Sequence, residues 1–206
     1  MIKDFNVTEE EIKKEMELPG LTRGFQGDLN YVLEKKGPEG VKKVEKETEK
    51  LGYPIKYEDL SESKWYPIGL RMVSLYSILA AFDWGKKELA ELAECVPKVS
   101  FVMKFFMRYF ASPQKTFKVA APIIWKRYFN VGAFETVYFK RTGKDGYAVL
   151  RIKDFRSSSI FCFFLGHFFI GAFKLAARFK EVDFEETKCV FKGNPYHEYL
   201  IKWLYF

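Results

Sequence analysis

The sequence predicts an α+β fold, in which an antiparallel four-stranded sheet is covered on one face by helices and follows a helical N-terminal half. Helix-type apolar patterns, separated by proline and glycine, fill the chain up to about Phe129. From Ala133 onward, two pairs of segments alternate polar and apolar residues as strands do. One long apolar helical segment lies between these pairs, so we expect the order β-β-α-β-β, which is typical of an α+β domain.

Residues 1–52 are predicted to form a helical N-terminal extension, followed by the α+β domain over residues 53–206. Thr8 is the predicted N-cap of the first helix, and Glu11 three residues later completes a capping box. A Gly-Pro pair at 37–38 separates the next two helical segments. Lys and Glu side chains three and four residues apart are typical of helices with an exposed face. We therefore expect these helices to wrap around the outside of the main domain.

The middle of the chain is predicted to contain four more helices, bounded by proline and serine residues and by a Trp-Tyr-Pro segment. They span residues 68–82, 86–95, 101–110 and 114–129. Pro97 is expected to end the second of them, because proline cannot donate the hydrogen bond that continues a helix. Pro122 lies inside the last one and is expected to kink it.

The C-terminal half is predicted to consist of two β-hairpins joined by a buried helix. The first hairpin pairs residues 133–141 with 146–154, and the helix spans residues 158–178. The second hairpin has an apolar run at 189–191, a turn near Gly193 and an aromatic run that follows it. This turn places Cys189 opposite His197, with Cβ atoms about 5 Å apart.

Charge and cysteine content limit the kinds of partner. The basic residues lie among 27 acidic ones, so we interpret the net charge of +7 as a solvated surface. The sequence has no recognition-helix pattern, RNA-binding aromatic motif or Lys/Arg block, so nucleic acid is not an expected partner. Three cysteines and no signal peptide predict a cytoplasmic location. The most apolar segment, 160–175, is shorter than the roughly 20 residues that cross a bilayer, so no transmembrane helix is expected.

The order of short motifs near the C-terminus resembles a known family. A Cys and a Gly open the apolar helix, Glu-x-x-Cys follows, and Gly-Asn-Pro precedes the terminal aromatic run. Over residues 122–206 this order resembles the 4-vinyl reductase-like domain family, within a wider ligand-binding superfamily that includes haem–nitric-oxide-binding sensors and TRAPP trafficking subunits. Upstream, the Trp-Tyr-Pro at 65–67 is similar to a related bacterial family. The resemblance implies that residues 53–206 form a ligand-binding domain that dimerises through helices.

The resemblance also implies a zinc site. Its positions fall on Cys162, Glu186 and Cys189, with His197 in place of the family's third cysteine. All four are zinc ligands, and a closed shell of four is structural rather than catalytic. However, residues three apart on a regular strand face opposite ways, so the site requires a bulge or an irregular strand end. The alternative is that both cysteines are small buried residues and His197 is a hydrogen-bonded hairpin residue.

Aromatic residues suggest an apolar cavity. The chain has 22 Phe and 12 Tyr, more than an ordinary core needs. The residues expected to line the cavity are Trp65, Tyr66, Trp125, Tyr128, Phe129, Phe163 and Phe164, although each could equally be core. His167 is either a satisfied core histidine or the polar group that orients a ligand there. No haem is expected, because the Tyr-x-Ser-x-Arg motif of the haem-binding branch is missing from the sequence.

Together these patterns predict a small-molecule or lipid-binding sensor or regulatory domain that is not catalytic and acts as a homodimer. Its expected ligand is a small apolar or aromatic molecule or a lipid. One alternative is a TRAPP-like trafficking or scaffold protein without a ligand. Another is a reductase of a vinyl-bearing tetrapyrrole, as the family name implies, but the sequence has no P-loop, dinucleotide fingerprint or nucleophile elbow.

Overall fold

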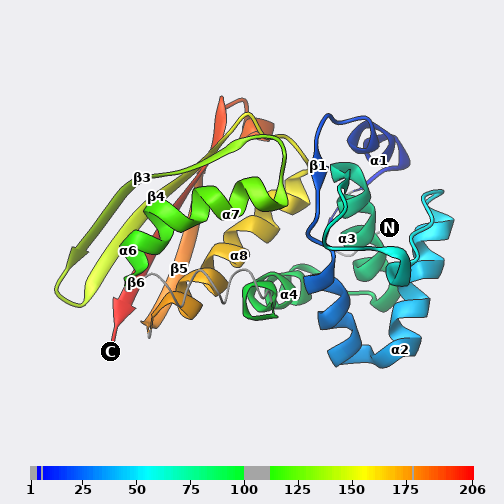
Figure 1. The fold of residues 1–206 in the computed structure, drawn as a ribbon, viewed down its shortest axis with the longest axis horizontal. Helices are drawn as coiled ribbons and strands as arrows, with labels where there is room; N and C mark the ends of the chain where they lie inside the picture. Colours follow the sequence, from blue (N-terminus) through cyan, green and yellow to red (C-terminus); the bar gives the residue numbers. More distant parts are fainter. Residues whose placement is uncertain (1–3, 6, 100–111, 178) are drawn as a thin grey trace.

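The computed structural model describes residues 4–5, 7–99, 112–177 and 179–206 and has the predicted α+β fold (Figure 1). The helices are α1 (Glu9–Met16), α2 (Gln26–Lys50), α3 (Ile68–Phe82), α4 (Lys86–Val99), α6 (Pro113–Lys115), α7 (Ala121–Tyr128) and α8 (Ser159–Ala176). The strands are β1 (Leu21–Thr22), β2 (Tyr66–Pro67), β3 (Ala133–Thr142), β4 (Asp145–Lys153), β5 (Phe179–Lys188) and β6 (Tyr196–Tyr205).

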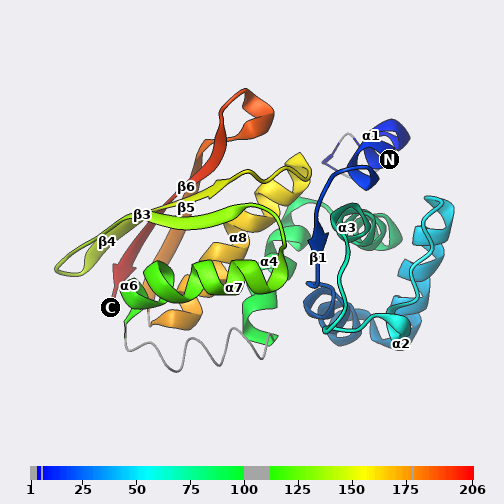
Figure 2. The same ribbon diagram turned by 45° about the horizontal axis from the view of Figure 1, so that its top comes forward.

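The main sheet has the order β3-β4-β6-β5, and every neighbouring pair is antiparallel. In β6, Tyr199 and Ile201 are fully buried, as Leu150 and Ile152 are in β4, so the two central strands form the floor of the core. Figure 2 shows α7 and α8 on the same side of this sheet. The predicted β-β-α-β-β order and the covering of one face by helices are therefore confirmed.

Helix α8 is buried between the sheet and α4. Its sequence is apolar on all sides, and Ser158 caps it by accepting a hydrogen bond from the Phe161 amide at 3.2 Å. Gly171 lies directly against the backbone of Glu94, so only a residue without Cβ lets α4 approach this closely. By length and composition α8 could cross a membrane, yet 61% of it is buried inside the protein, as is usual for a core helix.

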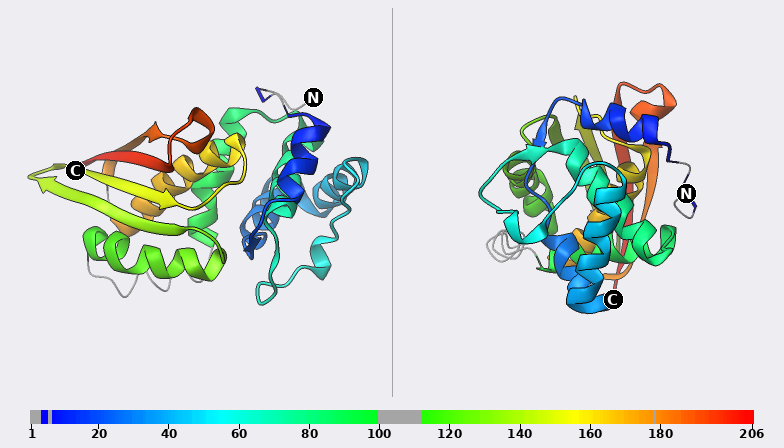
Figure 3. Two further views of the ribbon diagram at one scale, coloured as in Figure 1. Left: turned by 90° about the horizontal axis from the view of Figure 1, so that it is seen from above. Right: turned by 90° about the vertical axis from the view of Figure 1, so that its right-hand side faces the viewer.

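The N-terminal helices pack on the other end of the molecule, around α3 (Figures 1 and 3). Helix α3 is buried along most of its length, and Tyr31 and Val44 of α2 belong to the same apolar core as Leu75. Thr8 forms the predicted capping box with Glu11. Gly37 has a left-handed φ of 66° and interrupts α2 where the Gly-Pro pair predicted a break. The division at residue 52 stays a prediction.

Three local expectations differ from the structure. Helix α4 continues through the buried Pro97 to Val99, the last residue described before a gap, so Pro97 does not end it as expected. The segment expected as a helix at 114–129 contains a π-helical turn, Thr116–Ala120, and Pro122 falls in the first turn of α7, where proline fits without a kink. Residues Val190–Lys192 form a 3₁₀ turn instead of extending β5. The helix expected at 101–110 lies outside the described residues.

Candidate metal centre and ligand cavity

An apolar cavity of about 110 Å³ lies between the helices and the sheet. Its walls come from the beginning of α2 and from α3, α4, α7 and α8, with Phe134 of β3 at the base. Most of the lining side chains are aromatic or aliphatic. The cavity is therefore suited to an apolar guest.

Trp125 forms a fixed part of the cavity wall. Its indole Nε1 donates a hydrogen bond to the Val131 carbonyl at 3.1 Å, so its polar atom is satisfied away from the cavity. Its ring stacks on Phe129, with centroids 4.5 Å apart, and Phe129 contacts Phe161 of α8 edge-on. These contacts leave flat apolar surface for the cavity.

The polar residues that line the cavity are Arg23, Gln26, Asn30, Glu62 and Arg71. Arg71 of α3 is 3% exposed, and its guanidinium forms an ion pair with the fully buried Asp28. Burial lowers the pKa of Arg71 to about 9, which still leaves it charged at pH 7 beside the Asp28 carboxylate. Arg23 lies over the Trp65 ring at 4.0 Å, and its buried Nε has no hydrogen-bond partner among the described residues. The part of the cavity beside these two arginines can accept an anionic group.

The structure brings four of the eight predicted ligand-binding residues to the cavity: Trp125, Tyr128, Phe129 and Phe164. Trp65 lies beneath Arg23, and the Tyr66 hydroxyl accepts a hydrogen bond from the Ser61 amide. Phe163 and His167 lie on a different side of α8, where His167 Nδ1 is 3.2 Å from Glu94 Oε1. The sequence analysis missed Arg71, although a charged residue inside the apolar run 68–82 was a usable signal.

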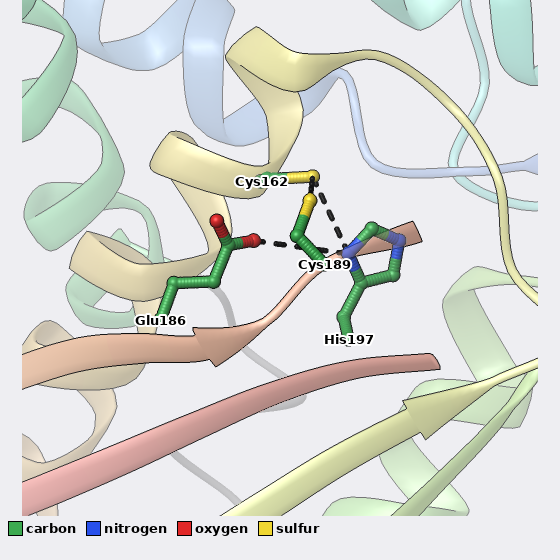
Figure 4. Close-up of side chains that lie close together, drawn as sticks. All are labelled: Cys162, Glu186, Cys189 and His197. Carbon is green, nitrogen blue, oxygen red and sulfur yellow. Dashed lines mark hydrogen bonds and ion pairs between the residues drawn. The ribbon is translucent and has the colours of Figure 1, made fainter. Parts of the chain in front are cut away.

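A second cluster contains Cys162, Glu186, Cys189 and His197 (Figure 4). The four side chains offer ligand atoms that all lie within 4.8 Å of one another. The two Sγ atoms are 3.8 Å apart, and Cys162 Sγ is 3.5 Å from His197 Nδ1. The residues come from the first turn of α8, from β5 and its end, and from the start of β6.

The local backbone explains how Glu186 and Cys189 reach one side. The pairing of β5 with β6 shifts register between Glu186 and Lys188, and β5 ends at Lys188. The chain then turns, and the Cys189 amide donates a hydrogen bond to Asn194 Oδ1 at 3.0 Å. This is the bulge and early strand end that the spacing required.

His197 is held in one orientation. Its Nε2 lies 3.2 Å from the Phe155 carbonyl oxygen, which can only accept, so Nε2 carries a proton and Nδ1 faces the cluster beside Cys162 Sγ. A ring nitrogen that donates to a backbone carbonyl is the usual outer contact of a metal-binding histidine. His197 is 1% exposed, so solvent does not compete for Nδ1.

The electrostatics of the cluster also suit a cation. Burial raises the pKa of the Cys162 and Cys189 thiols, so both stay protonated unless a positive charge compensates. Burial also raises the pKa of Glu186, but contacts with His197 and Lys192 outweigh this effect and leave that pKa below its usual value. The buried Glu186 Oε1 has no hydrogen-bond partner in the described structure and lies 3.8 Å from His197 Nδ1.

Among known proteins, no family model and no curated sequence matches this chain. An H-NOX protein from S. oneidensis, solved in the Fe(II)NO state, is similar in structure with a TM-score of 0.62 and 12% identity, over 88% of this chain and 97% of that chain. A mutant S. oneidensis H-NOX protein in the Fe(II) state is similar with a TM-score of 0.65 and 14% identity, over 89% of this chain and 98% of that chain. A mutant H-NOX protein from K. algicida is similar with a TM-score of 0.57 and 17% identity, over 88% of this chain and 95% of that chain. The chain shares the H-NOX fold.

The comparison shows the fold alone, so membership of the wider ligand-binding superfamily and the resemblance to 4-vinyl reductase-like domains both stay predictions. It also corrects one expectation. The missing Tyr-x-Ser-x-Arg motif led us to expect no haem, but the structural neighbours are haem-binding domains, so that expectation is wrong.

The described part of the cavity does not itself fit a haem. Its volume of about 110 Å³ is well below the roughly 300 Å³ at which drug-sized pockets begin. Among the described lining residues there is no histidine, cysteine or methionine. Tyr128 belongs to a residue type that can ligate haem iron. The lining that the structure describes therefore suits a guest smaller than haem.

Proposed function

We propose that this chain is a non-catalytic sensor domain that binds one small, mainly apolar molecule carrying an anionic group. The observation that carries the proposal is the apolar cavity with two guanidinium groups at one end, one of them with an unpartnered buried Nε. A buried donor without a partner is costly, and a ligand carboxylate would satisfy it. The H-NOX fold, which the S. oneidensis protein solved in the Fe(II)NO state shares, supports a ligand-binding role.

The size of the cavity narrows the ligand class. An apolar cavity of about 150 Å³ can hold benzene. The cavity here is about 110 Å³, so it suits a single ring or a short acyl chain. The aromatic wall at Trp125 and Phe129 favours a flat ring, and Arg23 favours a carboxylate. A small aromatic carboxylate is the ligand class that combines these features.

We further propose that Cys162, Glu186, Cys189 and His197 hold a zinc ion. Their ligand atoms are close enough to share one ion, and the donor set of two sulfurs, one nitrogen and one carboxylate oxygen is typical of zinc. With four protein ligands the site has a structural role. The ion would fix the first turn of α8, where Phe161 and Phe164 line the cavity, against β5 and β6.

Action as a homodimer and a cytoplasmic location belong to the same proposal. Light scattering that gives 24.2 kDa at high micromolar concentration would count against the dimer. A protein whose cavity takes no ligand would favour the scaffold alternative. A bound flavin or nicotinamide in the purified protein would favour the reductase.

The ligand is tested with benzoate and its neutral analogue benzamide. Benzoate is expected to raise the melting temperature of the purified protein more than benzamide does, because only benzoate can pair with Arg23. The Arg23→Met variant should lose this difference. The control Arg141→Met should keep it, because Arg141 lies over Tyr205 at the far end of the sheet. Equal effects of the two ligands on the unmodified chain would overturn the anionic part of the proposal.

Hemin is the third ligand of the same experiment. Binding of one hemin per chain, seen as a sharpened Soret band that benzoate does not compete away, would overturn the single-ring ligand. Native mass spectrometry of the protein as purified then reports retained ligand and retained metal separately. The two proposals can therefore fail independently.

A further inference from the structure

The positive charge of this protein is concentrated in one segment. Residues 96–134 contain seven basic residues and no acidic residue. The remaining 27 basic residues equal the 27 acidic ones, so this segment accounts for the whole net charge of +7. The interpretation of the basic residues as scattered among the acidic ones therefore does not hold for this segment. Such a segment is expected to contact an anionic partner.

Of the five described basic residues in this segment, Lys98 lies on α4 and the other four lie on one exposed helical face. Four exposed basic residues lie on the outer side of the helical region formed by α6, the π-helical turn and α7: Lys115, Lys118, Lys126 and Arg127. Between them, Val119 is 49% exposed and Ile123 is 51% exposed. An apolar pair is thus flanked by two basic residues on either side. Figures 2 and 3 show α7 at the outside of the molecule, beside the sheet.

The opposite face of the same region is already used. Phe117, Ile124 and Trp125 are buried and line the cavity. Val119 and Ile123 therefore lie on the outer face and stay exposed, although both side chains are apolar. Within the described ranges, no carboxylate lies within ion-pair distance of the four basic side chains. Among the described residues, therefore, neither the four charges nor the apolar pair is covered by another part of the chain.

We propose that this outer face of residues 113–128 docks on an anionic lipid membrane. Lysine and arginine at the two ends would contact lipid phosphates and carboxylates, and Val119 and Ile123 would enter the headgroup region between them. An amphipathic helix that is basic with an apolar centre is the usual structure for such binding. A nucleic acid would use the charges but not the two exposed aliphatic side chains. The inference concerns a surface separate from the cavity and does not depend on the ligand.

The test is cosedimentation of the full chain with vesicles of phosphatidylcholine containing 30% phosphatidylserine. Binding is expected to these vesicles, to fall as salt rises, and to be weak with phosphatidylcholine alone. The double variant Lys118→Glu and Lys126→Glu should reduce the partition coefficient at least about 20-fold. Val119→Ser with Ile123→Ser should also reduce it, at unchanged charge.

The control variant carries the same charge change elsewhere. Lys13→Glu with Lys46→Glu alters two exposed lysines on α1 and α2 and should leave most of the binding intact. An equal loss in this control would overturn the docking face, since only net charge would then matter. No binding of the unmodified chain to the anionic vesicles would also overturn it. A third contrary result would be a Val119→Ser, Ile123→Ser variant that binds duplex DNA but does not bind the vesicles.

Discussion

Cys162 Sγ and His197 Nδ1 lie 3.5 Å apart although the residues are 35 positions apart in the chain. Both are buried, and the contact joins the first turn of α8 to the central strand β6. Because Nε2 of the same ring donates to the Phe155 carbonyl, Nδ1 faces the thiol. The side chains are therefore already arranged as ligands around a common point.

The first prediction is that the purified protein contains about one zinc ion per chain, measured by elemental analysis. Chelation is expected to lower the melting temperature, because binding free energy of a structural ion is also folding free energy. Cys162→Ser should lose the ion and at least about 3 kcal/mol, or roughly 6–12 °C for a chain of this size. The control Cys95→Ser changes a cysteine outside the cluster and should keep both.

A metal-free protein would respond differently. Chelation would then change nothing, and Cys189→Ser would cost only about 1 to 2 kcal/mol, as an unsatisfied buried hydroxyl does. That outcome would leave the convergence of the four residues as ordinary packing.

The second prediction concerns the ion pair beside the cavity. Asp28→Asn is expected to destabilise the protein by about 3–5 kcal/mol, because it leaves the buried Arg71 guanidinium without its counter-ion. The double variant Asp28→Asn with Arg71→Met should recover part of this loss. Urea unfolding of the two variants measures the difference. A double variant less stable than the single one would show that Arg71 is held by other contacts.

The sequence predicted the fold better than it predicted the cavity. The residues of α3 match the predicted 68–82. Pro67 precedes this apolar run, and Asp83, which follows it, adopts a left-handed conformation that ends the helix. The four residues of the metal cluster were those that the family resemblance implied, and the structure brings them together. By contrast, α8 is apolar on all sides, so its pattern could not tell that Phe161 and Phe164 face the cavity while Phe163 and His167 contact each other elsewhere.

Long-range pairing was the other limit. Asp28 and Arg71 are each ordinary charged residues in the sequence, and only the packing of α2 on α3 shows that they neutralise one another. The β5 bulge that turns Glu186 toward Cys189 has no sequence signal of its own either, since register is set by the neighbouring strand.

The third prediction is a close-packing effect. Gly171→Ala is expected to destabilise the protein by about 1–3 kcal/mol, because the new methyl group would overlap the backbone of Glu94 and push α4 from α8. Gly24→Ala is the matched control, since a Cβ there meets only ordinary contacts of 3.8 Å or more. Thermal unfolding compares the two. Equal stability of both variants would contradict the close approach of the helices.

The last prediction is a pH dependence of stability that originates at Glu15. Burial raises the pKa of Glu15 to about 7, and hydrogen bonds from the Tyr76 hydroxyl only partly oppose this. Since the folded-state pKa lies above the unfolded one near 4.5, the stabilising contribution is complete below pH 4.5 and is lost as pH rises through 7.

Glu15 is only half-buried, so solvent screening limits the effect to about 1–2 kcal/mol. The free energy of unfolding should therefore fall by this amount between pH 5 and 8, measured with urea at several pH values. Glu15→Gln keeps the hydrogen-bonding shape but cannot ionise, so this variant should show a flatter profile over the same range. Glu9→Gln, at an exposed position at the start of the same helix, should retain the unmodified slope. A Glu15→Gln profile that parallels the unmodified protein would assign the pH dependence to another group.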